Sequence, residues 1–314
     1  MIQKSFLSLA HQKKLKCERF LDEMETIIPW DRFCDEVKPF YTEKETGRKR
    51  MELILMLKVY FLQQWYGLSD PAAEEAIYDR NSFQKFLDID LLSGNIPDET
   101  TILNFRHLLE EHQLQECFFA VVNDLLEQKG LLMREGTIVD ATIISAPSST
   151  KNKDQKRDCE MSQTKKGNQW YFGMKAHIGS DAKSGIVHHL ETTAAKINDR
   201  VPFQRLLHGE ERALFGDKGY YKQEDKKIAR ANGIFWGISD RGTRNHPLSS
   251  SQRKRNRKFS SVRSKVEHPF RVLKCQWGFT KVRYKGLLKN TMQLFALFSL
   301  ANLYRVRKTL LSTA

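Results

Sequence analysis

The chain has 314 residues, of which 40% are hydrophobic and 29% charged, and it contains only 17 glycines and 8 prolines. This composition excludes collagen-like, low-complexity and largely disordered proteins, and the length fits about two domains. The 5 cysteines are scattered without a CxxC pair, which argues against a disulfide scaffold or a zinc ribbon and favours a reducing compartment. No apolar run reaches the ~20 residues that a membrane span needs. We therefore expect a cytoplasmic protein with no membrane contact.

Positive charge is concentrated in one segment. Lys and Arg number 52 against 38 Asp and Glu, a formal net charge of +14. The segment 241–290 holds 15 of these bases and a single acid, Glu267, so it accounts for the whole excess. A block of one sign requires a polyanion to neutralise it, which predicts nucleic acid as the partner. A disordered basic loop is the alternative.

The first 130 residues are predicted to form a helical domain. An apolar-periodic run over 50–66 indicates a buried helix, and Pro71 marks the first turn of the next one. Further helices are expected to begin after Asp98 and to cover the apolar run 117–126.

The pattern changes near residue 135, where short β-branched runs begin to alternate with helical ones. A polar, Lys-rich stretch over 147–167 is predicted to be a loop. Strands are predicted over 136–145, 170–178, 185–193, 213–215 and 234–238. Helices are predicted over 201–208, 222–232, 262–274 and 292–304. Three strands followed by alternating helices and strands predict an α/β fold, a mixed sheet with helices packed on it.

Two aspartates occupy unusual positions in the predicted strands. Asp140 lies inside an apolar β-branched run, and an acid in a strand interior needs a partner. Asp217 follows the short strand 213–215 between two glycines, at the place where a sheet presents ligands at its carboxyl edge. The alternatives are an outward-facing Asp140 on an edge strand and an ordinary turn aspartate at Asp217.

Glu267 is the only acid in the stretch 241–314. On the predicted helix it shares a stripe with Arg263 and Arg271, which lie four residues before and after it. Pro269 removes one helical hydrogen bond, so we expect a kink or a restart beside Glu267. The alternative is a glutamate that only pairs with these two arginines. That alternative leaves unexplained why a single acid stands among so many bases.

Three carboxylates on separate elements that converge on one sheet edge suit the hard cations Mg²⁺ or Mn²⁺. Two such ions about 3.5–4 Å apart can activate a water and stabilise the leaving oxygen in phosphodiester cleavage. The histidines offer no rival site. His107 and His112 are five apart on a helix, and His188 and His189 are expected to point to opposite faces of a strand. We interpret them as structural.

Four short strings occur in order along most of the chain. They are 139–142 (VDAT), 167–179 (GNQWYFGMKAHIG), 216–220 (GDKGY) and 266–270 (VEHPF). Together they closely resemble DDE transposases of bacterial insertion sequences, specifically the insertion-sequence-five group. The stretch 97–105 (PDETTILNF) is similar to the helical domain that precedes the catalytic domain in that group.

The resemblance implies a ribonuclease-H-like catalytic domain over 131–314, preceded by a helical domain over 1–130 that binds the ends of the mobile element. It also implies that Asp140, Asp217 and Glu267 are the catalytic triad and the ligands of two Mg²⁺ ions, with Mn²⁺ as the substitute.

The wider family has a Tyr-x2-Arg-x3-Glu-x6-Lys signature around the glutamate. Arg263, Glu267 and Lys274 match its spacing, whereas Ser260 stands at the tyrosine position. This departure leaves the triad intact and affects only the contribution of the tyrosine on DNA.

The expected function is transposition: the protein cuts DNA at the element's ends and joins the 3′ ends to target DNA, as a homodimer in the synaptic complex and in association with the nucleoid. A ribonuclease-H-like nuclease without strand transfer and a catalytically silent DNA-binding protein derived from a transposase are the alternatives.

The free segment 253–258 is expected to be mobile because its charges repel one another. The predicted DNA contacts are Arg263, Lys274, Arg253, Lys254, Arg255, Arg257 and Lys258.

Overall fold

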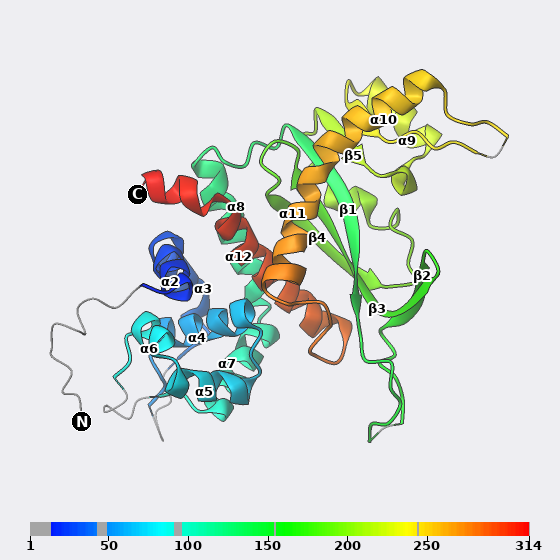
Figure 1. The fold of residues 1–314 in the computed structure, drawn as a ribbon. Helices are drawn as coiled ribbons and strands as arrows, with labels where there is room; N and C mark the ends of the chain where they lie inside the picture. Colours follow the sequence, from blue (N-terminus) through cyan, green and yellow to red (C-terminus); the bar gives the residue numbers. More distant parts are fainter. Residues whose placement is uncertain (1–13, 43–48, 91–95, 154, 244, 314) are drawn as a thin grey trace, which may run out of the picture. The chain divides into compact units, whose positions relative to one another are not determined.

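Two compact units make up the chain in the computed structural model (Figure 1). The structure describes residues 14–42, 49–90, 96–153, 155–243 and 245–313. One unit comprises 1–63, 68–107 and 306–314, and the other comprises 64–67 and 108–305.

Helices precede the sheet, as predicted. They are α2 (Lys16–Ile27), α3 (Trp30–Val37), α4 (Leu53–Tyr66), α5 (Asp70–Asp79), α6 (Asn81–Leu87), α7 (Glu99–Glu111) and α8 (Leu114–Gln128). Apolar side chains all around α4 explain its burial, with Leu57 and Phe61 almost fully enclosed. Ser69 caps the start of α5 by accepting the N–H of Ala72, and Pro71 lies in the first turn as expected. Helix α8 belongs to the unit that contains the sheet.

The second unit is built on a mixed sheet that has six strands in the described residues. They are β1 (Gly136–Ser145), β2 (Ser162–Lys166), β3 (Gln169–Asp181), β4 (Val187–Ala194), β5 (Ala213–Gly216) and β6 (Phe235–Ile238). The order is β2-β3-β1-β5-β6, and β4 also pairs with β3. β3 is antiparallel to β1, β2 and β4, whereas β5 is parallel to β1 and β6. This confirms the predicted α/β class.

Strand β2 was not expected, because the stretch 147–167 is polar throughout and was predicted to be a loop. β2 pairs with the first half of β3 through a turn at Gly167, which has a φ of 62°. A strand of this kind is held by its backbone partner rather than by burial of its side chains, so it leaves no apolar alternation in the sequence.

The two faces of the sheet are covered by different helices. On one face, Val139 and Leu214 pack with Phe203 of a short 3₁₀ helix (Phe203–Leu206) and with Ala229 of α9 (Gln223–Ala231). Asp140 follows Val139 directly and so faces the other side. That face is covered by α10 (Ser250–Arg263), α11 (Glu267–Arg271) and the first part of α12 (Leu287–Thr313) (Figure 1).

The helix that carries Glu267 is longer and less regular than predicted. After α10 the chain passes through a 3₁₀ turn (Ser264–Val266), restarts as α11 at Glu267, and ends in a π-helical turn (Val272–Gln276). The restart beside Glu267 confirms the irregularity that Pro269 predicted.

The prediction that 253–258 is mobile is wrong, because this segment lies within α10. Ser249 and Gln252 form a capping box that starts the helix. Phe259 then packs against Phe215 and Phe235 of the sheet, with ring centroids 6.4 and 5.8 Å apart. Repulsion between neighbouring like charges costs only about 0.2–0.5 kcal/mol per pair, which these anchors outweigh.

Helix α12 also extends beyond the predicted range 292–304. None of the helices in the described part of the chain is long and apolar enough to cross a membrane.

Candidate active site at the open edge of β1

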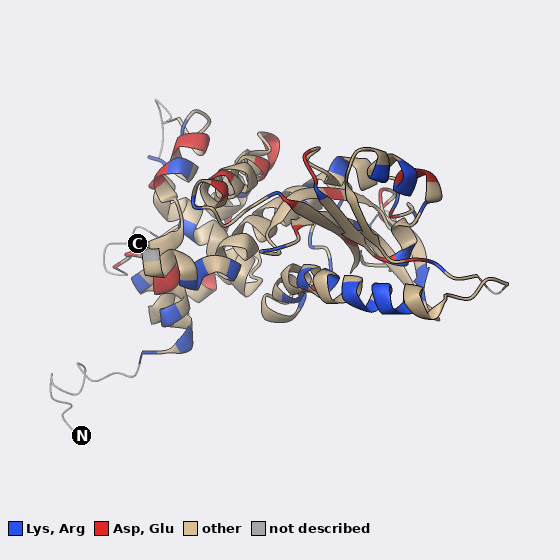
Figure 2. Ribbon diagram, turned by 90° about the horizontal axis from the view of Figure 1, so that it is seen from above, with Lys and Arg blue, Asp and Glu red and all other residues tan. Residues whose placement is uncertain are grey.

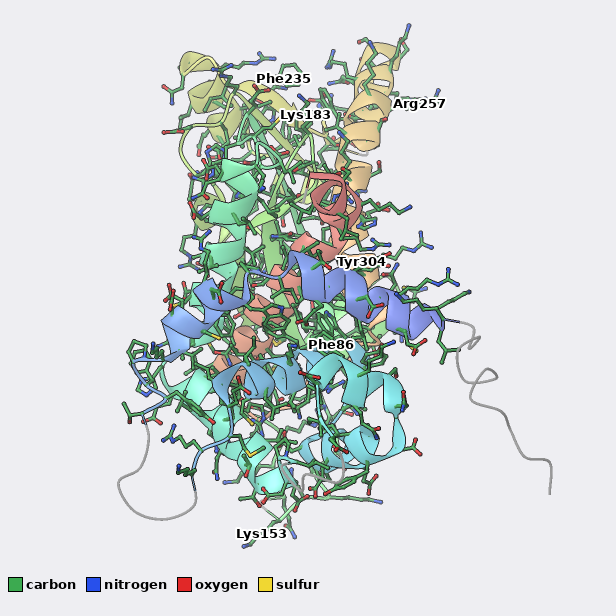
Figure 3. All side chains as sticks on the ribbon, turned by 90° about the vertical axis from the view of Figure 1, so that its left-hand side faces the viewer. Phe86, Lys153, Lys183, Phe235, Arg257 and Tyr304 are labelled. Carbon is green, nitrogen blue, oxygen red and sulfur yellow. The ribbon has the colours of Figure 1, made fainter. Side chains whose placement is uncertain are left out.

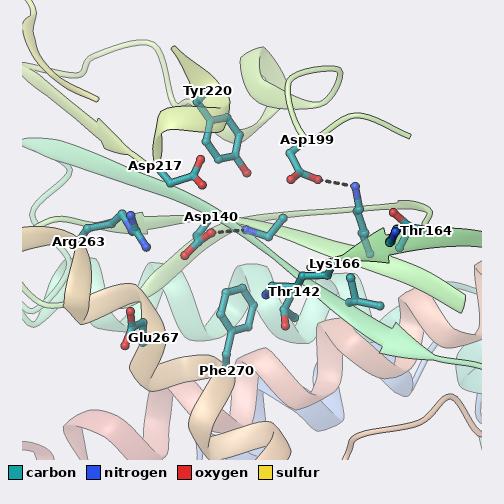
Figure 4. A pocket seen from close by; sticks show the side chains of 14 residues that line it. Asp140, Thr142, Thr164, Lys166, Asp199, Asp217, Tyr220, Arg263, Glu267 and Phe270 are labelled. Atoms are coloured by element: carbon teal, nitrogen blue, oxygen red, sulfur yellow. Dashed lines mark hydrogen bonds and ion pairs between the residues drawn. The ribbon is translucent and has the colours of Figure 1, made fainter. Parts of the chain in front are cut away.

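The three predicted acids line one pocket, with a volume of about 510 Å³. Figure 4 shows Asp140 near its centre, Asp217 on the wall formed after β5, and Glu267 on α11 at the opposite wall. Three separate elements, a strand, a turn and a helix, therefore bring these carboxylates together.

The register of the sheet explains why the pocket forms here. β5 pairs with β1 only as far as the pair Val139–Gly216. Asp140 and Asp217 are the residues that follow this last pair on two neighbouring parallel strands. From Asp140 onward the side of β1 that pairs with β5 is open until the isolated bridge at Ser145. The pocket occupies this open edge.

The side chain of Asp217 is fixed by the turn that follows it. Its Oδ1 accepts the N–H of Gly219 at 2.8 Å and so caps the 3₁₀ turn Lys218–Tyr220. The carboxylate is held in one orientation, half-buried, on the pocket wall.

The carboxyl group of Asp140 is mostly buried, and this changes its pKa. Burial raises its pKa from 3.8 to about 6, and the charge of Asp217 adds to this effect. The N–H of Ala141 on Oδ1 and the charge of Arg263 act in the opposite direction but are outweighed. A buried carboxylate with so little positive compensation provides a favourable site for a cation.

Glu267 is exposed and lies on the wall opposite the two aspartates. It makes no ion pair with Arg263, Arg271 or any other base within the described ranges, so the alternative of a purely structural Glu267 is not what the structure shows. Among the described residues, no three Asp, Glu, His or Cys side chains are close enough to hold a metal ion as arranged. The pocket therefore offers carboxylate oxygens, the ligands that hard cations prefer, from three acids that lie apart in this structure.

The two signature bases lie in different surroundings. Arg263 is half-buried, lines the carboxylate pocket and has no ion-pair partner among the residues described. The Lys274 ammonium instead donates to the Ile143 carbonyl at 2.7 Å and to Thr142 Oγ1 at 2.6 Å. Lys274 thus binds β1 along its open edge, and it is not among the residues that line the pocket.

The remaining predicted DNA contacts lie on the exposed side of α10. Figure 2 shows Lys and Arg repeating along this helix, and Figure 3 shows Arg257 on its outer side. Arg255 is tied to Asp240 at 3.0 Å, and Arg253 donates to the Leu248 carbonyl at 3.1 Å. Of these five predicted contacts, Lys254, Arg257 and Lys258 are exposed and have no partner among the described residues.

Several pocket residues were not predicted. Asp199 lies on the far side of the pocket, where Lys175 binds it at 2.8 Å. Lys166 reaches the pocket from the unpredicted strand β2. The sequence around Asp199 is a polar loop without apolar periodicity, so it carried no signal. Tyr220 is the last residue of the string 216–220, but the sequence predicted no role for its side chain.

A second pocket, of about 950 Å³, adjoins the first and shares Asp217 and Arg263 with it. Lys218, Arg241 and Ser260 also line it. Ser260, the departure from the family signature, therefore borders this second pocket on α10.

The expectation for the paired histidines was wrong. The β4 register shifts opposite Gly179 and Ser180, which leaves His188 in a bulge. The Nδ1 atoms of His188 and His189 consequently lie 2.6 Å apart instead of on opposite faces. Burial lowers the pKa of both residues, in keeping with neutral, structural side chains.

Comparison with known proteins decides the family. Residues 132–303, more than half of the chain, match the family described as "Transposase DDE domain", and residues 9–108 match "Transposase domain". The chain belongs to the DDE transposases. This is the DDE-type insertion-sequence family that the four strings indicated. The mixed sheet, which follows a helical region along the chain, is the ribonuclease-H-like catalytic fold of this family. Membership of the insertion-sequence-five group stays a prediction.

Two solved transposase structures are similar to this chain. One is the piggyBac transposase synaptic complex with hairpin DNA, at 10% identity and a TM-score of 0.45, covering 98% of this chain and 77% of that chain. The other is the Mos1 strand transfer complex, at 12% identity and a TM-score of 0.20, covering 81% of this chain and 87% of that chain.

Proposed function

We propose that this transposase cuts DNA at the ends of its insertion sequence and joins the 3′ ends to target DNA in the pocket along β1. The observation that carries the proposal is the convergence of Asp140, Asp217 and Glu267 on one pocket in a chain of this family. Acids from three elements at an open strand edge serve no evident packing purpose.

The same residues fit a divalent metal. Asp140, Asp217 and Glu267 would hold Mg²⁺ or Mn²⁺ ions in this pocket. When bound, such ions activate a water and stabilise the leaving oxygen of a phosphodiester. The raised pKa of Asp140 supports this assignment, because a nearby cation would restore its charged form.

Positive side chains next to the pocket would bind the DNA backbone. Arg263 can reach a phosphate beside the acids, and its guanidinium is suited to two-point contact with phosphate oxygens. The free bases of α10 extend this surface. Contacts of this kind position the duplex without reading its sequence.

We assign recognition of the element's ends to the helical segment 1–130. The catalytic part, 131–314, supplies charge but no evident base-reading element. Joining two ends in one event requires two ends in one complex, so we assign a homodimer to the synaptic complex.

The decisive experiment uses the purified chain, Mg²⁺ and a supercoiled plasmid that carries the inverted repeats flanking the gene. We expect cuts at the repeats and products joined to a second, target plasmid. Cuts without joined products would identify a nuclease that lacks strand transfer. Binding to the repeats without any cut would identify a silent DNA-binding protein.

A further inference from the structure

The hydroxyl of Tyr220 is a buried polar group that the described chain leaves without a hydrogen-bond partner. Tyr220 is 2% exposed, and its ring packs on Phe203 at 5.8 Å between centroids. The ring edge lines the carboxylate pocket, and Figure 4 shows the hydroxyl turned toward it. Buried hydroxyls are nearly always hydrogen-bonded, and a phenylalanine would fill the same packing space. The hydroxyl is therefore best explained by something that enters the pocket.

The nearest carboxylates do not use this donor. Asp217 accepts the N–H of Gly219 at 2.8 Å, and Asp140 accepts the N–H of Ala141 at 2.9 Å. Asp199 is paired with Lys175 at 2.8 Å. The remaining oxygens of Asp140 and Asp217 are those that a cation would take, which leaves the hydroxyl to a different acceptor.

The backbone holds Tyr220 rigidly beside Asp217. The two residues are the ends of one 3₁₀ turn, and the N–H of Tyr220 donates to the Asp217 carbonyl at 3.2 Å. Gly216 leaves space for the ring, because a Cβ there would lie 3.4 Å from Tyr220 Cδ2 and 3.0 Å from Val139 Cγ2. A donor fixed in this way needs no reorganisation when an anion arrives.

We propose that Tyr220 donates its hydroxyl hydrogen to one non-bridging oxygen of the phosphodiester that is cut in this pocket. The inference rests on the proposed function and adds a substrate-contacting residue to it. A neutral donor suits this position, because the phosphate already faces Arg263 and the acids. Burial and the surrounding carboxylates raise the pKa of Tyr220, so the hydroxyl keeps its hydrogen at neutral pH.

The test compares the full-length wild type with Tyr220→Phe on a duplex that carries one element end. The scissile phosphate is either unmodified or a single phosphorothioate diastereomer, Rp or Sp, and cleavage is measured in Mg²⁺. Tyr221→Phe is the matched control, because the Tyr221 hydroxyl donates to Gln223 Oε1 at 2.7 Å and does not line the pocket. Thermal unfolding of each variant verifies that it folds.

Tyr220→Phe is expected to lower kcat on the unmodified end by about 10- to 100-fold, the loss of one hydrogen bond to a charged group, with little change in KM. Sulfur at the contacted oxygen is a poor acceptor. That diastereomer should therefore slow the wild type and Tyr221→Phe but add almost nothing to the defect of Tyr220→Phe. The other diastereomer should slow all three proteins by the same factor.

Wild-type cleavage together with an undiminished Tyr220→Phe would overturn the inference and leave the proposed function standing. Equal sulfur effects in wild type and Tyr220→Phe for both diastereomers would do the same, because a merely structural role predicts no coupling. A wild type that cuts neither substrate would overturn the proposed function and this role of Tyr220 with it.

Discussion

Among single residues, Asp140 illustrates most directly that burying a charged carboxylate in the site lowers the stability of the folded protein. Its carboxylate is buried at the open edge of β1, and its pKa is raised from 3.8 to about 6. The folded chain thus binds a proton more tightly than the unfolded chain does. The stability of the metal-free protein should therefore fall as pH rises from about 4 to about 6.

Replacing this carboxylate should stabilise the metal-free protein. A shift of about two pKa units corresponds to about 3 kcal/mol, so Asp140→Asn in EDTA near pH 7.5 should gain up to that amount. Near pH 4 most of the gain should disappear, because the carboxyl is then protonated in the folded wild type and partly protonated in the unfolded chain. Urea denaturation at the two pH values measures this, with the exposed Asp31→Asn as control. A variant that is less stable than wild type near pH 7.5 would contradict the pKa assignment.

The convergence of Asp140, Asp217 and Glu267 on one pocket was predictable because each acid stands out from its surroundings in the sequence. Asp199 and Lys175 were not, because they meet only through the fold, from a loop and from β3. The contact between His188 and His189 depends on a bulge, which no periodic pattern reveals.

Of the individual elements, α10 is the one whose structure differs most from its sequence pattern. Its charges suggested a mobile segment, yet the side-chain amide of Asn256 bonds both the N–H and the carbonyl of Asp240. Arg255 and Lys226 bind the carboxylate of the same aspartate, at 3.0 and 3.2 Å. Asp240 therefore connects the end of β6 to α10. Because these anchors come from distant residues, local charge patterning could not predict them.

The fixed helix changes the expected salt dependence of DNA binding. Arg255 is already paired, so we expect phosphate contacts chiefly from Lys254, Arg257 and Lys258. Changing these three to Gln should weaken binding to all sequences alike and reduce the slope of log affinity against log salt by at most about 2.7, three contacts at 0.9 each. Filter binding at several salt concentrations measures the slope, and circular dichroism verifies the helix. An unchanged slope would show that α10 does not contact DNA.

For the molecule as a whole, the α/β class followed from the order of strand and helix patterns, and the short parallel strands β5 and β6 were located within about one residue. The strand order, with β1 between β3 and β5, depends on pairing between distant segments. Such pairing leaves no mark in local periodicity. It is nevertheless this order that places Asp140 beside Asp217.

The proposed assignment of end recognition to residues 1–130 and of catalysis to residues 131–314 leads to a separate prediction. A fragment of residues 1–130 should prefer duplex with the element's end over random duplex in a competition shift assay, because phosphate contacts elsewhere carry no sequence information. The fragment includes α8, which belongs to the unit with the sheet, so its folding is verified first by thermal unfolding. Equal affinity for both duplexes would contradict this assignment and indicate that residues 131–314 recognise the ends.

The central claim is that three acids from a strand, a turn and a helix act as one catalytic centre. Its most direct test is the joining of pre-cut element ends to a target plasmid in Mg²⁺ by wild type and by Asp140→Asn, Asp217→Asn and Glu267→Gln. We expect the wild type to join ends, and each variant to lose at least about 100-fold in rate while still binding the ends, because residues that act as a unit fail together. Joining at the wild-type rate by any one of the three variants would contradict the account.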